Sequence, residues 1–280
     1  MAGTHLLEHA LRTAQARGLS RLEAQQLLLH SLGRSAHERA WLLAHGDEPL
    51  THEQALTFER LQARFLDHEP MAYLLGEQEF FGLVLQVDAR VLAPRPDTET
   101  LVEWALTLNL NPQCTSALDM GTGSGAIALA LAQQRPGWRV HASDASADAL
   151  AVARANGERL HTSVHWRHGS WWGAVPGERF DLVLSNPPYI ADDDPHLAAL
   201  QHEPRSALAS GTDGLDDIRA IVAGAPAHLQ AGGWLLLEHG HEQASAVRAL
   251  LHAQGFAAVD SRKDLAGIAR CSGGRCVNPK

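Results

Sequence analysis

Apolar residues recur at the spacing of amphipathic helices through the first quarter of the chain. Three capping boxes mark helix starts, because a Ser or Thr and a Glu or Gln three residues later can each bond to the other's backbone nitrogen. They pair Ser20 with Glu23, Ser35 with Glu38, and Thr51 with Gln54. Gly33 and Gly46 stand where helices end, and Pro70 suits the first turn of a short helix over 71–75. The pattern predicts a helical domain over residues 1–75.

From Gly76 to Pro94 the apolar positions crowd together in the manner of strands. Asp88, Ala89 and Arg90 separate two extended runs, which predicts a β-hairpin linker over residues 76–95 with its turn at these residues. A helix is expected after Pro94 through about Leu108, with Asp97 as its N-cap.

The remaining chain, residues 96–280, alternates strand and helix patterns. Strands are predicted near 115–120, 138–144, 162–168, 180–185, 233–239, 256–262 and 268–277, the last as an edge strand. Helices are predicted near 125–135, 146–158, 213–229 and 242–253. The alternation predicts an α/β domain, a parallel sheet with helices on both faces.

The apolar strand at 180–185 runs into Asn186, Pro187, Pro188 and Tyr189. Two prolines end strand pairing, because neither can donate a backbone N–H, and they stiffen the direction of the carbonyls. The Asn186 side-chain oxygen and the Pro187 carbonyl could accept the two hydrogens of a planar amino group beside the Tyr189 ring. A turn that only closes a strand is the alternative.

A glycine-rich loop joins the strand near 115–120 to the next helix. It holds Gly121, Thr122, Gly123, Ser124 and Gly125. Glycines allow a tight turn and close approach of a ligand. The spacing is G-x-G-x-G, which differs from the dinucleotide fingerprint G-x-G-x-x-G. The loop is similar to the S-adenosylmethionine loop.

An acid, Asp144, ends the following strand, where its carboxylate could accept both ribose hydroxyls. It could also cap the helix that starts near Ser146. Asp119, at the junction of strand and loop, is interpreted as an organiser of the loop. Loop, acid and Asn-Pro-Pro-Tyr all lie at carboxyl ends of predicted parallel strands, the edge where such sheets bind ligands.

Composition narrows the class of protein. The chain has 280 residues and a formal net charge of −9, which argues against binding to bare duplex DNA. No apolar stretch reaches about 18 residues, so no membrane-spanning helix is expected. The N-terminus lacks the pattern of a secretion signal, and we expect a cytoplasmic location.

Metal chemistry is not expected. Cys114, Cys271 and Cys276 are too scattered for a disulfide framework, and the C-x4-C spacing of the last two has no second ligand pair. His239 and His241 flank Gly240 after a strand, and we interpret them as solvated loop residues rather than ligands.

Taken together, these motifs resemble the release-factor glutamine N5-methyltransferase family (PrmC/HemK) over nearly the whole chain. The resemblance lies in residues 39–46 (RAWLLAHG), 94–99 (PRPDTE), 119–128 (DMGTGSGAIA), 185–190 (SNPPYI) and 235–240 (LLLEHG). It implies a seven-stranded, Rossmann-like class I methyltransferase sheet whose last strand is antiparallel, preceded by a helical domain and a hairpin linker. We interpret the helical domain as a substrate-docking domain, and simple stabilisation of the catalytic domain is the alternative.

The resemblance also implies an activity. The enzyme would transfer a methyl group from S-adenosylmethionine to the glutamine amide of the Gly-Gly-Gln motif in class I peptide-chain release factors, acting as a monomer. Gly121–Gly125, Asp144 and Trp171 would hold the cofactor, together with Asn186. Asn186, Pro187, Pro188 and Tyr189 would hold the substrate amide.

Ser170 departs from the family pattern, which often has Asp there, and an acid would accept from the adenine amino group more strongly. Trp172 is interpreted as a core residue. Alternatives for the substrate are the glutamine of a ribosomal protein or, with less support, the N6 of adenine in DNA, which would require base flipping. A cofactor-sensing module without activity is the alternative at the level of protein class.

Overall fold

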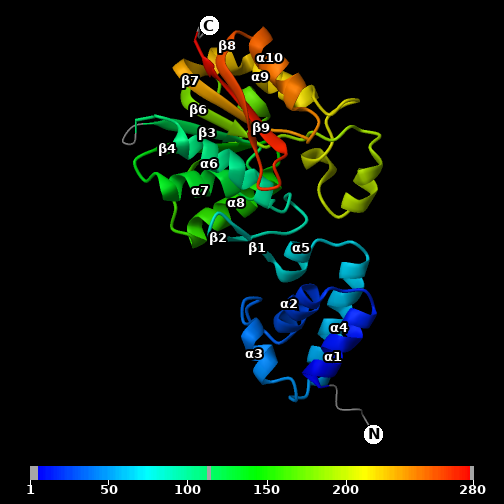
Figure 1. Cartoon of the computed structure of the whole chain (residues 1–280). Coiled ribbons are helices and arrows are strands. Elements are labelled where there is room, and N and C mark those ends of the chain that lie inside the picture. The colour runs from blue at the N-terminus through cyan, green and yellow to red at the C-terminus, as the bar shows by residue number, and fades with distance from the viewer. Residues whose placement is uncertain (1–5, 112–114, 278–280) are drawn as a thin grey trace. The chain divides into compact units, whose positions relative to one another are not determined.

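The computed structural model describes residues 6–111 and 115–277, so Cys114 lies outside the described residues (Figure 1). The chain divides into two compact units, Met1–Gly76 and Glu77–Lys280, and each is described by itself. The hairpin that follows Gly76 belongs to the second unit.

The first unit is helical, as the sequence predicts. Its helices are α1 (Leu7–Ala16), α2 (Arg21–Ser31), α3 (Arg39–Ala44), α4 (His52–Leu66) and α5 (Met71–Leu75). The capping boxes of Ser20 and Thr51 form as predicted at the starts of α2 and α4. Leucines from α1, α2 and α3 join Phe58 of α4 in a core that belongs to this unit alone.

The predicted capping box at Ser35 forms only in part. The Glu38 side chain accepts from the Ser35 backbone nitrogen, but the Ser35 hydroxyl accepts from His37 rather than from Glu38. Helix α3 therefore begins later, at Arg39.

The second unit begins with the hairpin of β1 (Glu77–Phe80) and β2 (Leu83–Gln86). The predicted position of its turn is wrong. The chain turns at Phe81 and Gly82, both at positive φ (51° and 75°), as a two-residue hairpin of the I′ kind requires. Asp88 instead closes a separate turn by accepting from Arg90. The sequence did not indicate a turn at Phe81, because a bulky residue rarely adopts positive φ.

The other strands of this unit form one seven-stranded sheet in the order β5-β4-β3-β6-β7-β9-β8. The helices that alternate with them complete the predicted pattern. In chain order the elements are α6 (Glu99–Thr107), β3 (Ser116–Met120), α7 (Ala126–Gln134), β4 (Arg139–Asp144), α8 (Ala147–Arg159), β5 (His165–His168), β6 (Phe180–Ser185), α9 (Asp216–His228), β7 (Leu229–Glu238), α10 (Ala244–Ala253), β8 (Phe256–Lys263) and β9 (Ala269–Cys276).

The strands β5, β4, β3, β6 and β7 are parallel, and β9 runs antiparallel to its neighbours β7 and β8. The predicted edge position of β9 is wrong, since it lies between two strands. Gly273 and Gly274 allow this close fit, because a Cβ at Gly273 would lie 2.5 Å from a Leu236 methyl carbon. The edge strand at this end of the sheet is β8, whose exposed charged side chains discourage further pairing.

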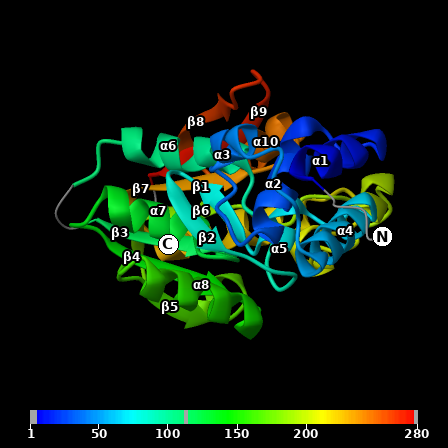
Figure 2. The ribbon, with the colours of Figure 1, turned by 90° about the horizontal axis from the view of Figure 1, so that it is seen from below.

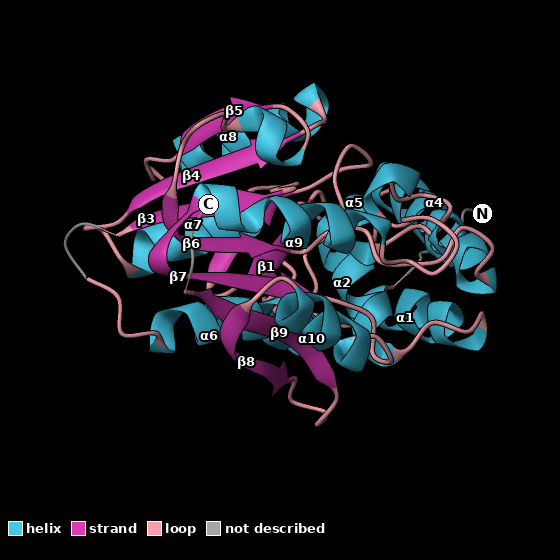
Figure 3. Cartoon of the chain, turned by 90° about the horizontal axis from the view of Figure 1, so that it is seen from above, coloured by secondary structure: helices cyan, strands magenta, loops and turns pink. Residues whose placement is uncertain are grey.

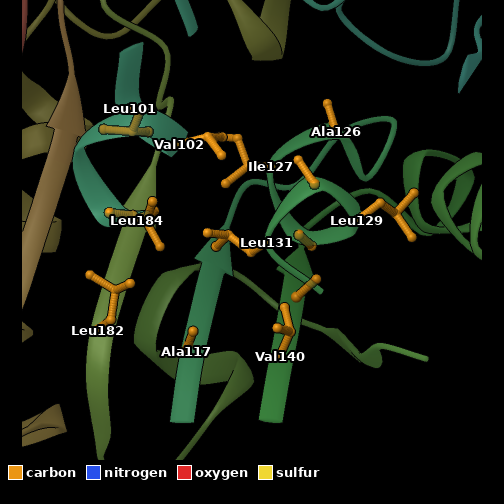
Figure 4. Close-up of a cluster of buried hydrophobic side chains, with 14 of the residues drawn as sticks. Leu101, Val102, Ala117, Ala126, Ile127, Leu129, Leu131, Val140, Leu182 and Leu184 are labelled. Atoms are coloured by element: carbon orange, nitrogen blue, oxygen red, sulfur yellow. The ribbon is translucent and has the colours of Figure 1, made fainter. Parts of the chain in front are cut away.

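Both faces of the sheet are covered (Figure 3). Leu182 and Leu184 of β6 point into a core formed with α6 and α7, and the intervening Val183 points into a core formed with α9 and α10. Figure 4 shows the first of these cores, with Leu101 and Val102 of α6 on one side and Leu129 of α7 on the other. Helix α8 lies along β4 and β5 at one end of the sheet (Figure 2).

Helix α6 starts differently from the prediction. Residues Pro96–Thr98 form a 3-10 turn, Thr98 is the N-cap, and neither it nor Asp97 supplies a side-chain cap. Asp97 instead forms an ion pair with Arg270 of β9, 3.3 Å apart. In the described part of the chain, no helix has the length and apolar character needed to span a membrane.

Candidate active site

The carboxyl ends of β4, β3, β6 and β7 lie side by side at one edge of the sheet, because these strands are neighbours and parallel. A cavity of about 300 Å³ opens at this edge. Predicted site residues that line it are Gly121, Thr122, Gly123, Ser124, Asp144, Trp171, Asn186 and Pro188. Gly125, Pro187 and Tyr189 are not among the residues lining it.

The glycine loop follows β3 and is held by its neighbour β4. The backbone nitrogens of Gly121 and Thr122 both donate to the Ser143 carbonyl, at 2.8 and 2.9 Å. Gly121 and Gly123 adopt positive φ, which favours glycine. No atom lies within 4 Å of a Cβ placed on Gly123, so this backbone faces open space in which a ligand can approach it.

Asp119 organises the loop, as interpreted from the sequence. Its Oδ2 accepts from the Thr122 hydroxyl at 2.6 Å and from the Ala128 nitrogen at 3.2 Å. The carboxyl is fully buried, and burial raises its pKa to about 7 despite these donors.

Gly125 has a packing role in the structure. It begins α7 at φ 86°, and a Cβ there would lie 3.0 Å from Leu129 Cδ1 and 3.3 Å from Ala153 Cβ. The third glycine of the loop therefore lets helices α7 and α8 approach each other, and the cavity is formed by the other loop residues.

The Asp144 carboxylate joins β4 to the glycine loop. Its Oδ2 accepts from the Gly123 nitrogen at 2.9 Å, and its Oδ1 accepts from the Ser146 nitrogen at 2.8 Å. The N-cap of α8 is Ser146, whose hydroxyl accepts from Ala149. A carboxylate has about four lone-pair sites, so Asp144 keeps acceptor capacity on the cavity side.

Trp171 forms a wall of the cavity. Its ring lies over Gly121, with Cζ3 3.5 Å from the position of a Cβ there. Its indole nitrogen donates to Asp217 Oδ1 at 3.0 Å, and the other Asp217 oxygen accepts from the Ser210 hydroxyl. This anchoring holds Trp171 at a strained φ of 44°. Ser170 lies in the same wall.

Trp172 packs away from the cavity, in agreement with the sequence interpretation. Its indole nitrogen donates to the Ile221 carbonyl at 3.0 Å, and its ring stacks on His228 with a centroid distance of 4.7 Å.

Asn186 follows β6 and is oriented by a residue far away in the sequence. Its Nδ2 donates to the Thr98 hydroxyl at 3.2 Å. Thr98 is buried and lines the cavity. With Nδ2 directed at Thr98, the amide oxygen of Asn186 is left to accept a hydrogen bond from a ligand.

Tyr189 packs against the core under α9, and its hydroxyl lies 3.4 Å from Glu238 Oε1. Glu238 ends β7 and is buried, and burial raises its pKa to about 7. Burial likewise raises the pKa of Tyr189 well above its usual value, so the phenol stays protonated.

Thr98, Asp217 and Glu238 were not predicted as site residues. A signal existed for Glu238, an acid that directly ends an apolar strand on the ligand-binding edge. Thr98 and Asp217 gave no such signal, because they lie in a 3-10 turn and in the first turn of α9 and reach the site only through the tertiary structure.

The interpretation of His239 as a solvated loop residue is wrong. His239 is fully buried rather than solvated, and its ring nitrogens lie 2.7 Å from the Ser272 hydroxyl and 2.9 Å from the Gly240 carbonyl. Cys271 and Cys276 lie in the cores on opposite faces of the sheet. Among residues 6–111 and 115–277, no cluster of His, Cys, Asp and Glu suits a metal ion.

Each of the two units matches a known protein family. The model of the PrmC N-terminal domain matches residues 5–76, and the model of the methyltransferase small domain matches residues 98–255. The crystal structure of a methyltransferase from Pyrococcus furiosus has the same fold, with a TM-score of 0.55, 20% identity, and coverage of 78% of this chain and 99% of that one.

Curated relatives are similar over nearly their full length. The release factor glutamine methyltransferase of Xylella fastidiosa is 48% identical over 271 residues, 95% of this chain and 97% of the relative. That of Bordetella pertussis is 50% identical over 260 residues, 92% and 95% of the two chains. With its two matched domains and a methyltransferase cavity at the expected edge of the sheet, the chain belongs to the release factor glutamine methyltransferase family.

Proposed function

We propose that this protein transfers a methyl group from S-adenosylmethionine to the side-chain amide nitrogen of the glutamine in the Gly-Gly-Gln motif of class I release factors. One observation supports an amide as the group that receives the methyl. Asn186 has its own nitrogen bound to Thr98, so its oxygen is presented at the cavity that the glycine loop and Asp144 also line.

The cavity suits the cofactor. Gly123 leaves room for close contact with its backbone, Asp144 has lone pairs for the ribose hydroxyls, and Trp171 offers a flat wall for the adenine. Ser170 would meet the adenine amino group with a hydroxyl, a weaker acceptor than a carboxylate. When bound, S-adenosylmethionine supplies the electrophilic methyl carbon and the leaving group.

The chain's own residues would hold the substrate amide. The Asn186 oxygen and the Pro187 carbonyl each accept one N–H, and Tyr189 packs against the amide plane, with Pro188 completing the wall. An amide nitrogen is a poor nucleophile, so alignment matters most. Holding two reactants in attack geometry can supply about 7–11 kcal/mol of a barrier.

Deprotonation needs no strong base in this proposal. Methyl transfer leaves the amide nitrogen positively charged, and this cation can release a proton to a neighbouring acceptor or to water to give the neutral N-methyl amide. Glu238 is only 1% exposed, so we do not assign it this role.

We further propose that the helical unit docks the release factor. Its residues surround a hollow of about 470 Å³ lined by charged groups, including Arg12, Arg21 and Asp47, and Leu43 at this hollow is 69% exposed. We also propose that the enzyme acts as a monomer, and that it works in the cytoplasm because its proposed substrate takes part in translation.

The deciding experiment presents purified protein and labelled S-adenosylmethionine with a class I release factor, a ribosomal protein or duplex DNA. We expect label in the release factor only, at the glutamine of Gly-Gly-Gln by mass spectrometry. A release factor whose glutamine is replaced by alanine is the matched control. Label that persists in this control, or that enters the ribosomal protein or DNA instead, would contradict the proposal.

A further inference from the structure

A buried acid lies behind the substrate-binding residues without a role in the steps above. Glu238 is only 1% exposed, and its Oε2 has no hydrogen-bond partner. Burying a carboxyl group with one oxygen unpaired costs stability. The groups that face it are the hydroxyls of Thr98 and Tyr189, with Asp97 and Arg270 nearby.

Two hydroxyls act on this acid. The Tyr189 hydroxyl donates to Glu238 Oε1 across 3.4 Å, and hydrogen bonding by Thr98 lowers the pKa of the carboxyl, which favours its charged form. Ionised carboxylates accept hydrogen bonds and cannot donate them. Glu238 therefore determines the direction of both hydrogen bonds.

Through its own hydrogen bonds, Thr98 determines the orientation of the Asn186 amide. A threonine hydroxyl has one hydrogen and two lone pairs. Thr98 accepts from Asn186 Nδ2 at 3.2 Å, so its own hydrogen is left to donate elsewhere, and Glu238 is the acid whose pKa it lowers. The Asn186 amide is thus held in one of its two flip states, with its oxygen away from Thr98.

The opposite flip state would be unproductive. If Thr98 turned its hydrogen toward Asn186, the Asn186 oxygen would face Thr98 and its NH2 group would face the ligand. Two NH2 groups cannot bond to each other as donor and acceptor. A substrate amide would then lose one of its two acceptors.

We propose that Glu238 is a positioning residue for methyl transfer, which acts through Thr98 so that Asn186 presents its oxygen to the substrate amide. Tyr189 is held by the same carboxylate, so one buried acid orients both side chains of the Asn-Pro-Pro-Tyr segment. This inference rests on the proposed function, since it concerns the same acceptor site.

The test compares Thr98→Val, which removes the hydroxyl at nearly constant shape, with Thr98→Ser, which keeps it. Glu238→Gln removes the charge, and Glu242→Gln is its matched control, an exposed acid four residues further on. For each full-length variant, kcat and KM are measured with release factor, cofactor Kd by calorimetry, and folding by thermal melting.

We expect Thr98→Val and Glu238→Gln to lower kcat by about tenfold or more, because misorientation of one acceptor is costly to attack geometry. Thr98→Ser and Glu242→Gln should stay within about threefold of the wild type, and cofactor Kd should change by less than about twofold in all four. The double variant of Thr98→Val with Glu238→Gln should be little worse than either single variant, since both act on one chain of hydrogen bonds.

The outcomes separate the two proposals. Wild-type enzyme that methylates no release factor would overturn the proposed function, and this inference with it. Active wild type together with a Thr98→Val variant as fast as Thr98→Ser would overturn the positioning role alone. So would fully additive losses in the double variant. If Glu238→Gln fails to fold, the comparison of Thr98→Val with Thr98→Ser still tests the positioning role.

Discussion

The Asp144 carboxylate accepts a hydrogen bond from the Gly123 backbone nitrogen at 2.9 Å, which connects the end of β4 to the loop that follows β3. One side chain therefore both shapes the glycine loop and faces the cavity.

Replacing Asp144 should weaken cofactor binding first. We expect Asp144→Ala to raise the Kd for S-adenosylmethionine by about 10- to 100-fold, the equivalent of losing charge-assisted hydrogen bonds worth about 1.5–3 kcal/mol. Calorimetry measures the change. Asp148→Ala, an exposed acid in the first turn of α8, is the matched control. Unchanged affinity in Asp144→Ala would refute the ribose assignment.

Replacing Asn186 should have the reverse effect. Asn186→Ala removes an acceptor for the substrate amide, and we expect a loss in kcat of about 100-fold or more with cofactor Kd changed by less than about threefold. Steady-state kinetics with release factor and calorimetry together give both values. A loss of cofactor affinity as large as that of Asp144→Ala would mean that Asn186 acts on the cofactor instead.

Alanine substitutions of Gly123 and Gly125 in the loop should impair the protein in different ways. Both adopt positive φ, so alanine strains both backbones by about 1 kcal/mol or more. Gly125→Ala adds a methyl group 3.0 Å from Leu129 Cδ1, and overpacking of this kind costs about 1–3 kcal/mol more. Chemical denaturation should therefore show the larger loss of stability in Gly125→Ala. Gly123→Ala should instead lose more cofactor affinity, and equal stability losses would contradict the packing role.

Turnover should depend on pH near neutrality. Burial raises the pKa of Glu238 to about 7, and the charges of Asp97 and Arg270 and the Tyr189 hydroxyl act on it as well. Below this pKa the carboxyl carries a proton and can donate to Thr98, so kcat should fall as the pH falls through about 7. The thiol of Cys271, its cross-strand neighbour, stays protonated because burial raises its pKa.

The variant Glu238→Gln checks the origin of this pH dependence. A pH profile of kcat should lose its acidic limb near 7 in this variant and keep it in Glu242→Gln. Asp119 also has a pKa of about 7 because of burial. An acidic limb that survives in Glu238→Gln would assign the titration to Asp119 and contradict the role given to Glu238.

Docking by the helical unit can be tested at its surface. Leu43→Asp places a charge on an exposed side chain at the hollow of this unit, and we expect KM for release factor to rise by about tenfold with kcat and cofactor Kd unchanged. Leu66→Asp, at an exposed leucine that does not line the hollow, is the control. Equal KM values in the two variants would remove Leu43 from the docking surface.

Much of the fold and of the candidate site could be predicted from local sequence patterns. The alternation of strands and helices, the capping boxes of Ser20 and Thr51, and the glycine loop, Asp144 and Asn186 at strand ends all depend on neighbours in the sequence. Errors arose where tertiary contacts overrode local preference. Phe81 accepts a positive φ in the hairpin turn, and Asp97 pairs with Arg270 instead of capping α6.

By itself, then, the sequence determined which elements form and which polar residues stand at their ends, because periodicity and turn chemistry are local properties. Only the tertiary structure decided that β9 inserts beside β7 and that Thr98, Glu238 and Asn186 meet. Those contacts join residues as far apart as 98, 186 and 238. Parallel strands bring Asn186, after β6, and Glu238, at the end of β7, to one edge of the sheet, and the turn before α6 adds Thr98 there.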